Sequence, residues 1–114
     1  MKLHEIRNYL NAKLICGEEL LNDDLDHAFA SDLMSDVLTL NSNQFLLITG
    51  LCNIQTIRTA EMADLNYLLL CRGKKASEEM LELAIENGMI ILETDMSMFS
   101  TVGILYEKGM RGMF

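Results

Sequence analysis

Phe45-Leu-Leu-Ile48 is a run of four apolar residues, and similar runs follow it at 66–71 (Asn-Tyr-Leu-Leu-Leu-Cys) and 89–93 (Met-Ile-Ile-Leu-Glu). A strand that is covered on both faces has this pattern, because neither face meets water. After each run comes a polar or glycine-containing break and then a helical pattern. Strand then helix, three times with short connections, predicts an α/β domain with a mostly parallel sheet covered by helices.

Polar residues that can cap a helix follow each of these runs. Their side chains accept hydrogen bonds from backbone N–H groups that a helix start leaves free. The predicted helices run from Asn53 to about Asp64, from Ser77 to Asn87-Gly88, and from Ser97 to Gly109. The last of them is expected to present Met98, Val102, Leu105 and Tyr106 on one face.

The N-terminal third of the chain supplies further elements. Apolar spacing predicts a helix over 2–10, and a strand follows over 13–16. A loop over 18–26 leads into a strand over about 26–30. Ser31 or Asp32 is expected to cap a helix to about Leu38, with Leu33, Met34, Val37 and Leu38 on one face. The whole chain, residues 1–114, then forms a single domain with a sheet of about five strands, since no proline or linker-like segment interrupts it.

Charge and composition exclude several classes of protein. Half of the residues are apolar and 23% are charged, a balance typical of globular rather than disordered chains. Nine Lys and Arg against 17 Asp and Glu give a net charge of −8, which disfavours nucleic-acid and membrane-surface partners. No run approaches the roughly 18 apolar residues of a membrane helix. Without an export signal, and with three cysteines that are interpreted as free thiols, the chain is expected to be cytoplasmic.

Basic residues gather at the predicted carboxyl ends of the strands. Arg72, Lys74 and Lys75 follow the second apolar run, and Arg58 lies early in the preceding helix. In open α/β sheets, ligands bind at this edge because helix N-termini converge there. We therefore expect a small anionic ligand at a site that contains Thr49, Gly50, Asn53, Arg58, Arg72, Gly73, Lys74, Lys75, Thr94 and Asp95. The alternative, a solvated basic loop, stays open at this point.

No catalytic group, metal site or cofactor is predicted. His4 and His27 lack partners at ligand spacing, and the chain contains neither a phosphate-binding loop nor a dinucleotide-binding glycine motif. Cys52 and Cys71 are expected at strand ends, where a nearby cation could lower a thiol pKa and support redox chemistry. The competing interpretation is that both are buried and inert.

Short motifs spread along the chain resemble a stand-alone DRTGG domain. The segments that carry this resemblance are 28–37 (Ala-Phe-Ala-Ser-Asp-Leu-Met-Ser-Asp-Val), 47–50 (Leu-Ile-Thr-Gly), 57–60 (Ile-Arg-Thr-Ala), 71–75 (Cys-Arg-Gly-Lys-Lys) and 92–95 (Leu-Glu-Thr-Asp). DRTGG domains are similar to the N-terminal domain of HPr kinase/phosphorylase and also occur beside CBS domains. The resemblance implies a regulatory or dimer-forming module without catalytic activity. Leu51 replaces an expected second glycine, so anion contacts are expected from Arg72, Lys74 and Lys75 instead.

Two functional hypotheses follow. The first is a non-catalytic regulatory module that senses a nucleotide or phosphometabolite at the strand ends. The alternative is a dimerisation or protein-interaction module that needs no small molecule, which the apolar content and the exposed-looking tail over 110–114 favour. A homo-oligomer, with a dimer as the first expectation, or a protein partner is compatible with both hypotheses.

Overall fold

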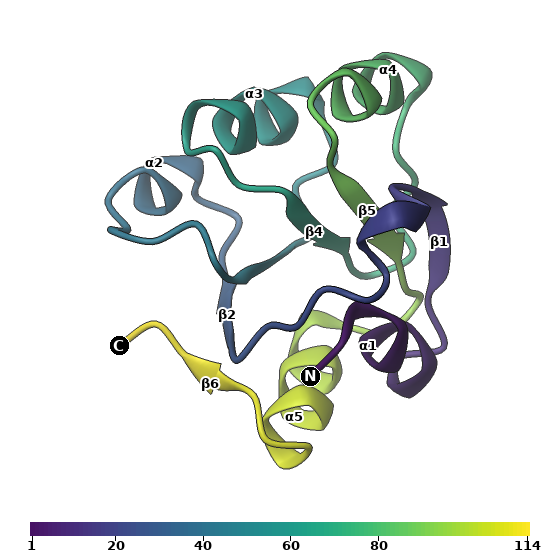
Figure 1. The fold of residues 1–114 in the computed structure, drawn as a ribbon, viewed down its shortest axis with the longest axis vertical. Helices are drawn as coiled ribbons and strands as arrows, with labels where there is room; N and C mark the ends of the chain where they lie inside the picture. Colours follow the sequence, from purple (N-terminus) through teal and green to yellow (C-terminus); the bar gives the residue numbers. More distant parts are fainter.

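Six strands form one sheet in the computed structural model, which describes residues 1–114 (Figure 1). The strand order across the sheet is β1-β5-β4-β3-β2-β6. The elements in chain order are α1 (Leu3–Tyr9), β1 (Lys13–Cys16), a 3₁₀ turn (Glu18–Leu20), β2 (His27–Ala30), α2 (Met34–Val37), β3 (Leu46–Thr49), α3 (Ile54–Met62), β4 (Tyr67–Leu70), α4 (Glu78–Glu86), β5 (Ile90–Glu93), α5 (Met98–Glu107) and β6 (Arg111–Gly112).

The centre of the sheet is parallel, as the sequence predicts. Strands β2, β3, β4 and β5 all run in one direction, and β1 pairs with β5 in the antiparallel direction. The carboxyl ends of the four parallel strands therefore lie along the same edge. The short strand β6 pairs in parallel with the start of β2, where Arg111 lies opposite His27 and Gly112 opposite Ala28. This sixth strand was not predicted.

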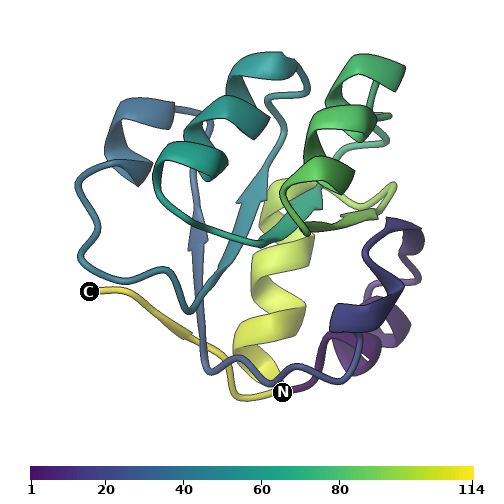
Figure 2. The same ribbon diagram turned by 45° about the horizontal axis from the view of Figure 1, so that its top comes forward.

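Helices cover both faces of the sheet (Figures 1 and 2). Helices α2, α3 and α4 lie on one face, and α1 and α5 lie on the other. Alternate residues of β3 serve the two layers: Leu46 and Ile48 pack with α1 and α5, whereas Leu47 packs with α2, α3 and α4. All four residues of β3 are buried. The apolar run of β3 is continuous because helices cover both faces of the strand, as the sequence predicts.

The three later helices begin where the sequence predicts. Asn53 accepts a hydrogen bond from the backbone N–H of Gln55, Ser77 accepts one from Met80, and Ser97 accepts one from Ser100. Each cap satisfies one of the free N–H groups at a helix start. Each helix follows the carboxyl end of one strand: α3 follows β3, α5 follows β5, and α4 follows β4 after a longer loop at 71–76.

The prediction for the region around α2 was wrong in two respects. Neither Ser31 nor Asp32 caps the helix, which starts later, at Met34, and spans only four residues. Its predicted face is also split, because Met34 and Val37 are buried whereas Leu33 and Leu38 are 58% and 46% exposed. The Ser31 hydroxyl instead accepts a hydrogen bond from Leu33 N–H in a local turn. The Asp32 carboxylate accepts a hydrogen bond from Gly50 N–H, just after β3.

Two expectations for the C-terminal region also need correction. On α5 the buried residues are Thr101 and Leu105, whereas Val102 and Tyr106 face solvent at 37% and 60% exposure. The tail is not wholly exposed either, because Met110 is buried and the next two residues form β6. None of the helices has both the length and the apolar character that a membrane-spanning segment needs.

Candidate functional site

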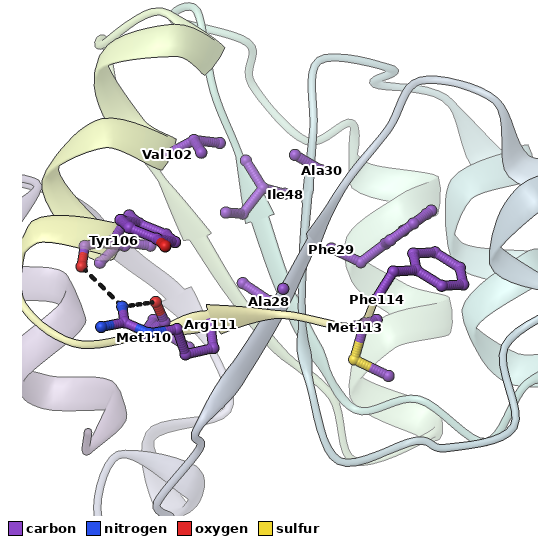
Figure 3. A pocket seen from close by; sticks show the side chains of 12 residues that line it. Ala28, Phe29, Ala30, Ile48, Val102, Tyr106, Met110, Arg111, Met113 and Phe114 are labelled. Carbon is purple, nitrogen blue, oxygen red and sulfur yellow. Dashed lines mark hydrogen bonds between the residues drawn. The ribbon is translucent and has the colours of Figure 1, made fainter.

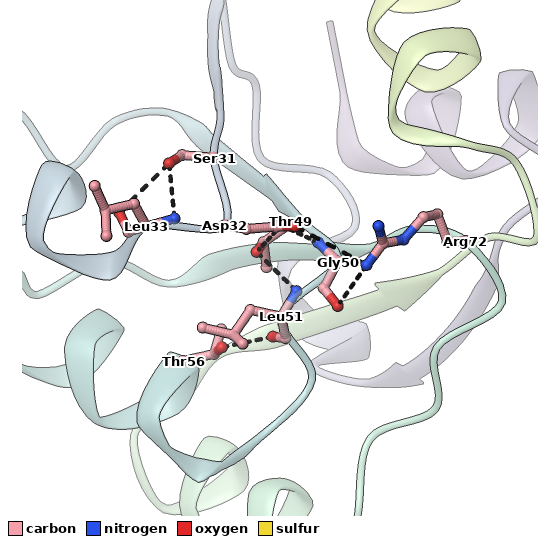
Figure 4. Close-up of polar contacts among 8 residues, drawn as sticks. All are labelled: Ser31, Asp32, Leu33, Thr49, Gly50, Leu51, Thr56 and Arg72. Carbon is pink, nitrogen blue, oxygen red and sulfur yellow. Dashed lines mark hydrogen bonds and ion pairs between the residues drawn. The ribbon is translucent and has the colours of Figure 1, made fainter.

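The candidate site lies where the carboxyl ends of β2, β3, β4 and β5 meet the loops that lead into helices (Figure 4). The residues that the sequence predicts for it lie at the ends of β3, β4 and β5 and in the loops that follow, except for Arg58 in α3. The loop that follows β4 contains three of the four predicted cations, Arg72, Lys74 and Lys75, and its residues 71–74 form a turn. Its neighbours are Thr49-Gly50 after β3 and Thr94-Asp95 after β5.

Backbone conformation sets the position of Arg72. Its φ angle is 64°, an uncommon value for a residue other than glycine, and the φ of Gly73 is 72°. Two successive positive φ angles with a hydrogen bond from Lys74 N–H to Cys71 O (3.4 Å) have the pattern of a type I′ turn. The turn is fastened to the segment after β5, since Arg72 N–H donates to Met96 O (2.7 Å) and Gly73 N–H donates to Thr94 O (3.0 Å).

The guanidinium of Arg72 lies directly over Gly50. A Cβ atom placed on Gly50 would be 2.6 Å from Nη2 and 2.9 Å from Cζ of Arg72, so only glycine leaves room for this arrangement. Arg72 Nη2 also donates to the carbonyl oxygen of Gly50 at 3.5 Å (Figure 4). The arginine side chain stays 51% exposed. It therefore reaches across the edge of the sheet and still faces solvent.

Asp32 is the residue of this network that the sequence reasoning missed. Its Oδ1 accepts hydrogen bonds from the backbone N–H of Gly50 (2.7 Å) and from the hydroxyl of Thr49 (3.0 Å), and its Oδ2 lies 3.9 Å from Arg72 Nη2. The sequence did contain a signal that could have identified Asp32. Asp32 follows β2, a strand parallel to β3, so the rule that ligands lie at carboxyl ends of strands applies to it as well.

A second carboxylate accompanies the lysines. Glu93, the last residue of β5, has a buried side chain whose Oε2 accepts a hydrogen bond from Ala76 N–H at 2.7 Å. Its Oε1 lies 3.9 Å from Lys75 Nζ. Lys74 is exposed and has no ion pair or side-chain hydrogen bond. The basic loop is thus partly neutralised by Asp32 and Glu93, and Lys74 is the cation with no such partner.

The structure distributes the other predicted residues unequally. Thr49 is buried, and its hydroxyl also accepts a hydrogen bond from Leu51 N–H. Asn53 serves as the cap of α3, and Arg58 is an exposed residue in the middle of that helix, without an ion pair. Asp95 is exposed near Gly73, where its Oδ1 lies 3.4 Å from the position that a Cβ on Gly73 would take.

Thr94 belongs to the predicted site, but its hydroxyl does not face the anion-binding edge. Thr94 is 3% exposed, and its hydroxyl donates to the carbonyl oxygen of Leu10 at 2.8 Å and accepts from Met96 N–H at 3.3 Å. The side chain therefore points toward the C-terminal end of α1. Thr94 contributes its backbone carbonyl to the turn instead.

The cysteines have thiols that resist ionisation. Burial is the main cause that raises the pKa of both Cys52 and Cys71, and for Cys52 the negative charge of Glu93 adds to it. The basic neighbours Lys74 and Arg72 act in the opposite direction without overcoming burial. Cys52 Sγ donates a hydrogen bond to Lys75 O at 2.9 Å. Such protonated thiols are poor nucleophiles at neutral pH, and this chemistry favours the inert interpretation.

An apolar groove of about 350 Å³ lies elsewhere, between β2, β6 and α5 (Figure 3). None of the ten predicted site residues lines it. The groove and the polar edge are therefore separate features, and Arg111 is the one charged residue that lines the groove. No group of three or more His, Cys, Asp or Glu side chains is placed to hold a metal ion.

The fold and the site define a mostly parallel α/β domain in which three helix N-termini and a basic turn meet at one edge of the sheet. A sequence profile of the DRTGG domain matches residues 5–107. The chain belongs to the DRTGG domain family. This finding confirms the resemblance that the sequence motifs indicate.

A solved structure supports the fold assignment. It is that of the CBS and DRTGG domains of the regulatory region of Clostridium perfringens pyrophosphatase, complexed with the activator diadenosine tetraphosphate. The TM-score is 0.73 at 16% sequence identity, and the match covers 96% of the present chain and 50% of the other. The present chain thus spans half of the length of that chain. No curated protein sequence matches the chain.

Proposed function

We propose that this chain is a non-catalytic regulatory module that binds a small anionic ligand, a nucleotide or phosphometabolite, at the carboxyl ends of β3, β4 and β5. Family membership supports a regulatory role, since the pyrophosphatase region of similar fold is regulatory. That region is complexed with diadenosine tetraphosphate, which is an anionic nucleotide. The proposal for the present chain rests on its own residues at this edge.

The observation that carries the proposal is the state of Arg72. A guanidinium has five N–H donors in a planar fork that suits phosphate and carboxylate groups. Here the side chain makes one long hydrogen bond, to Gly50 O, and one loose ion pair, to Asp32 at 3.9 Å. An arginine held at positive φ, half exposed and with most of its donors unused, is prepared for a further acceptor.

Neighbouring groups favour an anion at the same place. The N-termini of α3, α4 and α5 follow the strand ends, and the positive end of each helix dipole favours negative charge. Lys74 adds an exposed cation without a carboxylate partner. The carboxylates of Asp32, Glu93 and Asp95 limit the total positive charge, so the edge suits one small ligand rather than a long polyanion.

Thermal denaturation in the presence of defined anions tests the proposal. The probes are inorganic phosphate, nucleoside mono-, di- and triphosphates, diadenosine tetraphosphate and sugar phosphates. A ligand present at 100 times its dissociation constant should stabilise the fold by about 2.7 kcal/mol. We expect at least one probe to raise the melting temperature of the wild-type chain and to have little effect on Arg72→Ala and Lys74→Ala.

Lys108→Ala is the matched control. It removes the same charge as Lys74→Ala, but Lys108 lies at the C-terminal end of α5, where it contacts the ring of Tyr9. The control should retain the full ligand-induced shift. The proposal fails if no anion stabilises the wild-type chain, or if the shift in Arg72→Ala equals that of the wild type.

A further inference from the structure

Helix α5 exposes an apolar stripe to solvent. Phe99, Val102, Gly103 and Tyr106 follow one another at intervals of three, one and three residues, which places them on one side of a helix. Phe99 is 90% exposed, Tyr106 60% and Val102 37%. The opposite side of the helix, with Thr101 and Leu105, packs on the sheet. We call these four residues the α5 stripe.

Gly103 is the unusual member of the α5 stripe. A glycine in the middle of a helix costs about 1 kcal/mol relative to alanine. Its φ is not positive, and a Cβ placed on it would have no atom within 4 Å, so neither the backbone nor the surrounding packing of this chain requires a glycine there. A missing side chain on an exposed helix face allows another backbone to approach closely. The glycine therefore indicates a contact made from outside the chain.

The apolar groove continues the same surface. Val102 and Tyr106 form its wall, and Ala28, Ala30 and Ile48 lie beside them (Figure 3). Arg111 holds this wall in place, because its guanidinium carbon lies 4.5 Å from the centre of the Tyr106 ring and its Nη1 donates to Tyr106 O at 3.2 Å. Phe114, 99% exposed, also lines the groove.

The charge and symmetry of the surface favour a second copy of this chain as its occupant. Nine of the ten residues of α5 are uncharged, the exception being Glu107 at its end, although the protein carries a net charge of −8. Two copies can therefore meet along α5 without bringing their acidic residues together. The α5 stripe is also symmetric about its middle, with an aromatic residue at each end and Val102-Gly103 between them. A two-fold axis needs such a self-complementary patch.

The area available is sufficient for a dimer. A buried aromatic side chain covers about 150–250 Å², so Phe99, Tyr106 and Phe114, at their exposed fractions, offer about 500 Å² in each copy. If all three become fully buried, two copies bury about 1,000 Å² through these side chains, which is the lower limit for a specific interface. Val102 and the floor of the groove add to this area.

We propose that two copies of this chain associate through the α5 stripe, with the two helices antiparallel across a two-fold axis beside Gly103. Phe99 of each copy packs against Tyr106 of the partner subunit and into the groove next to it. The α5 stripe begins at Phe99 in the first turn of α5, and the basic turn at 71–74 is hydrogen-bonded to Met96 just before that helix. Association is therefore measured without added anion, so that its outcome is separate from that of the proposed anion site.

Sedimentation equilibrium of the full chain from low to high micromolar concentration tests the interface. We expect the wild-type chain to form dimers, and both Phe99→Glu and Gly103→Leu to weaken association by at least about 30-fold, the loss typical of a central interface residue. Phe99 is 90% exposed, and nothing surrounds a Cβ at position 103, so both variants should fold. Circular dichroism and the melting temperature at a concentration where the wild type is monomeric check that they do.

Ile85→Glu provides the matched control. Ile85 is a 60% exposed apolar residue of α4, on the opposite face of the sheet from α5. The Ile85→Glu variant should dimerise as the wild type does. A wild-type chain that stays monomeric at high micromolar concentration overturns the proposal. So does a dimer that Phe99→Glu leaves intact, or one that Ile85→Glu dissociates as strongly as Phe99→Glu does.

Discussion

The carboxylate of Asp32 accepts a hydrogen bond from the backbone N–H of Gly50 at 2.7 Å, although 18 residues separate the two in the chain. The same oxygen accepts from the Thr49 hydroxyl, so one side chain fastens the loop after β2 to the end of β3. Arg72 then lies over Gly50 from the other side. The position of the arginine therefore depends on a contact between two loops that precede it.

Replacing Asp32 tests this arrangement. In Asp32→Ala, the Thr49 hydroxyl and the Gly50 N–H lose their acceptor, and a partly buried donor left unpaired costs about 1–3 kcal/mol. Asp32→Asn keeps one acceptor oxygen and should lose less. Urea denaturation measures the free energy of unfolding. Asp36→Ala removes an equal charge from an exposed side chain without hydrogen bonds and should stay within about 0.5 kcal/mol of the wild type. A stability of Asp32→Ala equal to that of Asp36→Ala would contradict the role assigned to Asp32.

Gly50→Ala should separate anion binding from folding. The new methyl group would meet only the flexible end of Arg72, which can swing toward solvent, so we expect less than about 1 kcal/mol of lost stability. The displaced guanidinium should no longer be held for an acceptor. Titration calorimetry with an anion that binds the wild type should show affinity reduced at least about tenfold. Unchanged affinity would show that the position of Arg72 over Gly50 does not matter for binding.

Gly17→Ala should have the opposite outcome, a severe loss of stability. Gly17 has a φ of 86°, and a Cβ there would lie 2.4 Å from the Cα of Ile90, an atom of β5 that cannot move aside. Strain at positive φ costs about 1–2 kcal/mol and overpacking about 1–3 kcal/mol, so the free energy of unfolding should fall by about 2–5 kcal/mol. Gly88→Ala is the control, because its φ is also positive but no atom lies within 4 Å of its Cβ. Equal losses in the two variants would mean that the contact with β5 has no effect.

The raised pKa of Tyr67 predicts that the stability of the fold depends on pH above about pH 10. Its hydroxyl donates to Asp23 Oδ2 at 2.8 Å, and burial, with Asp23 beside it, raises the pKa of Tyr67 from 10.0 to about 12. As the pH rises, the unfolded chain loses the Tyr67 proton at a lower pH than the folded chain does. The contribution of Tyr67 to stability is therefore complete below pH 10 and is lost as the pH rises toward 12.

The comparison with Tyr67→Phe isolates this effect from other groups that titrate above pH 10. The phenylalanine variant keeps the apolar ring but has no proton to release. Urea denaturation between pH 8 and pH 12 should show the wild type more stable at pH 8, with the advantage shrinking as the pH rises. A constant difference across this range would contradict the raised pKa.

Local patterns were sufficient to predict most of the fold. The three apolar runs became β3, β4 and β5, and Asn53, Ser77 and Ser97 cap the helices that follow. Both signals depend on residues within a few positions of each other, so they can be read along the chain. Strand β6 has only two residues and no apolar alternation, and it exists because β2 offers it an edge. Helix α2 was overestimated because its pattern does not show that Leu33 and Leu38 face solvent.

The sequence by itself determined that Thr49-Gly50, Arg72-Gly73 and Thr94-Asp95 lie at one edge, because parallel strands have their carboxyl ends on the same side. Only the tertiary structure decided which side chains act there. Thr94 turns toward Leu10, 84 residues away, and Asp32 joins from a loop that sequence reasoning assigned to a helix cap. The direction of a polar side chain depends on which distant donor or acceptor comes within about 3 Å of it, and that distance is set by packing rather than by spacing along the chain.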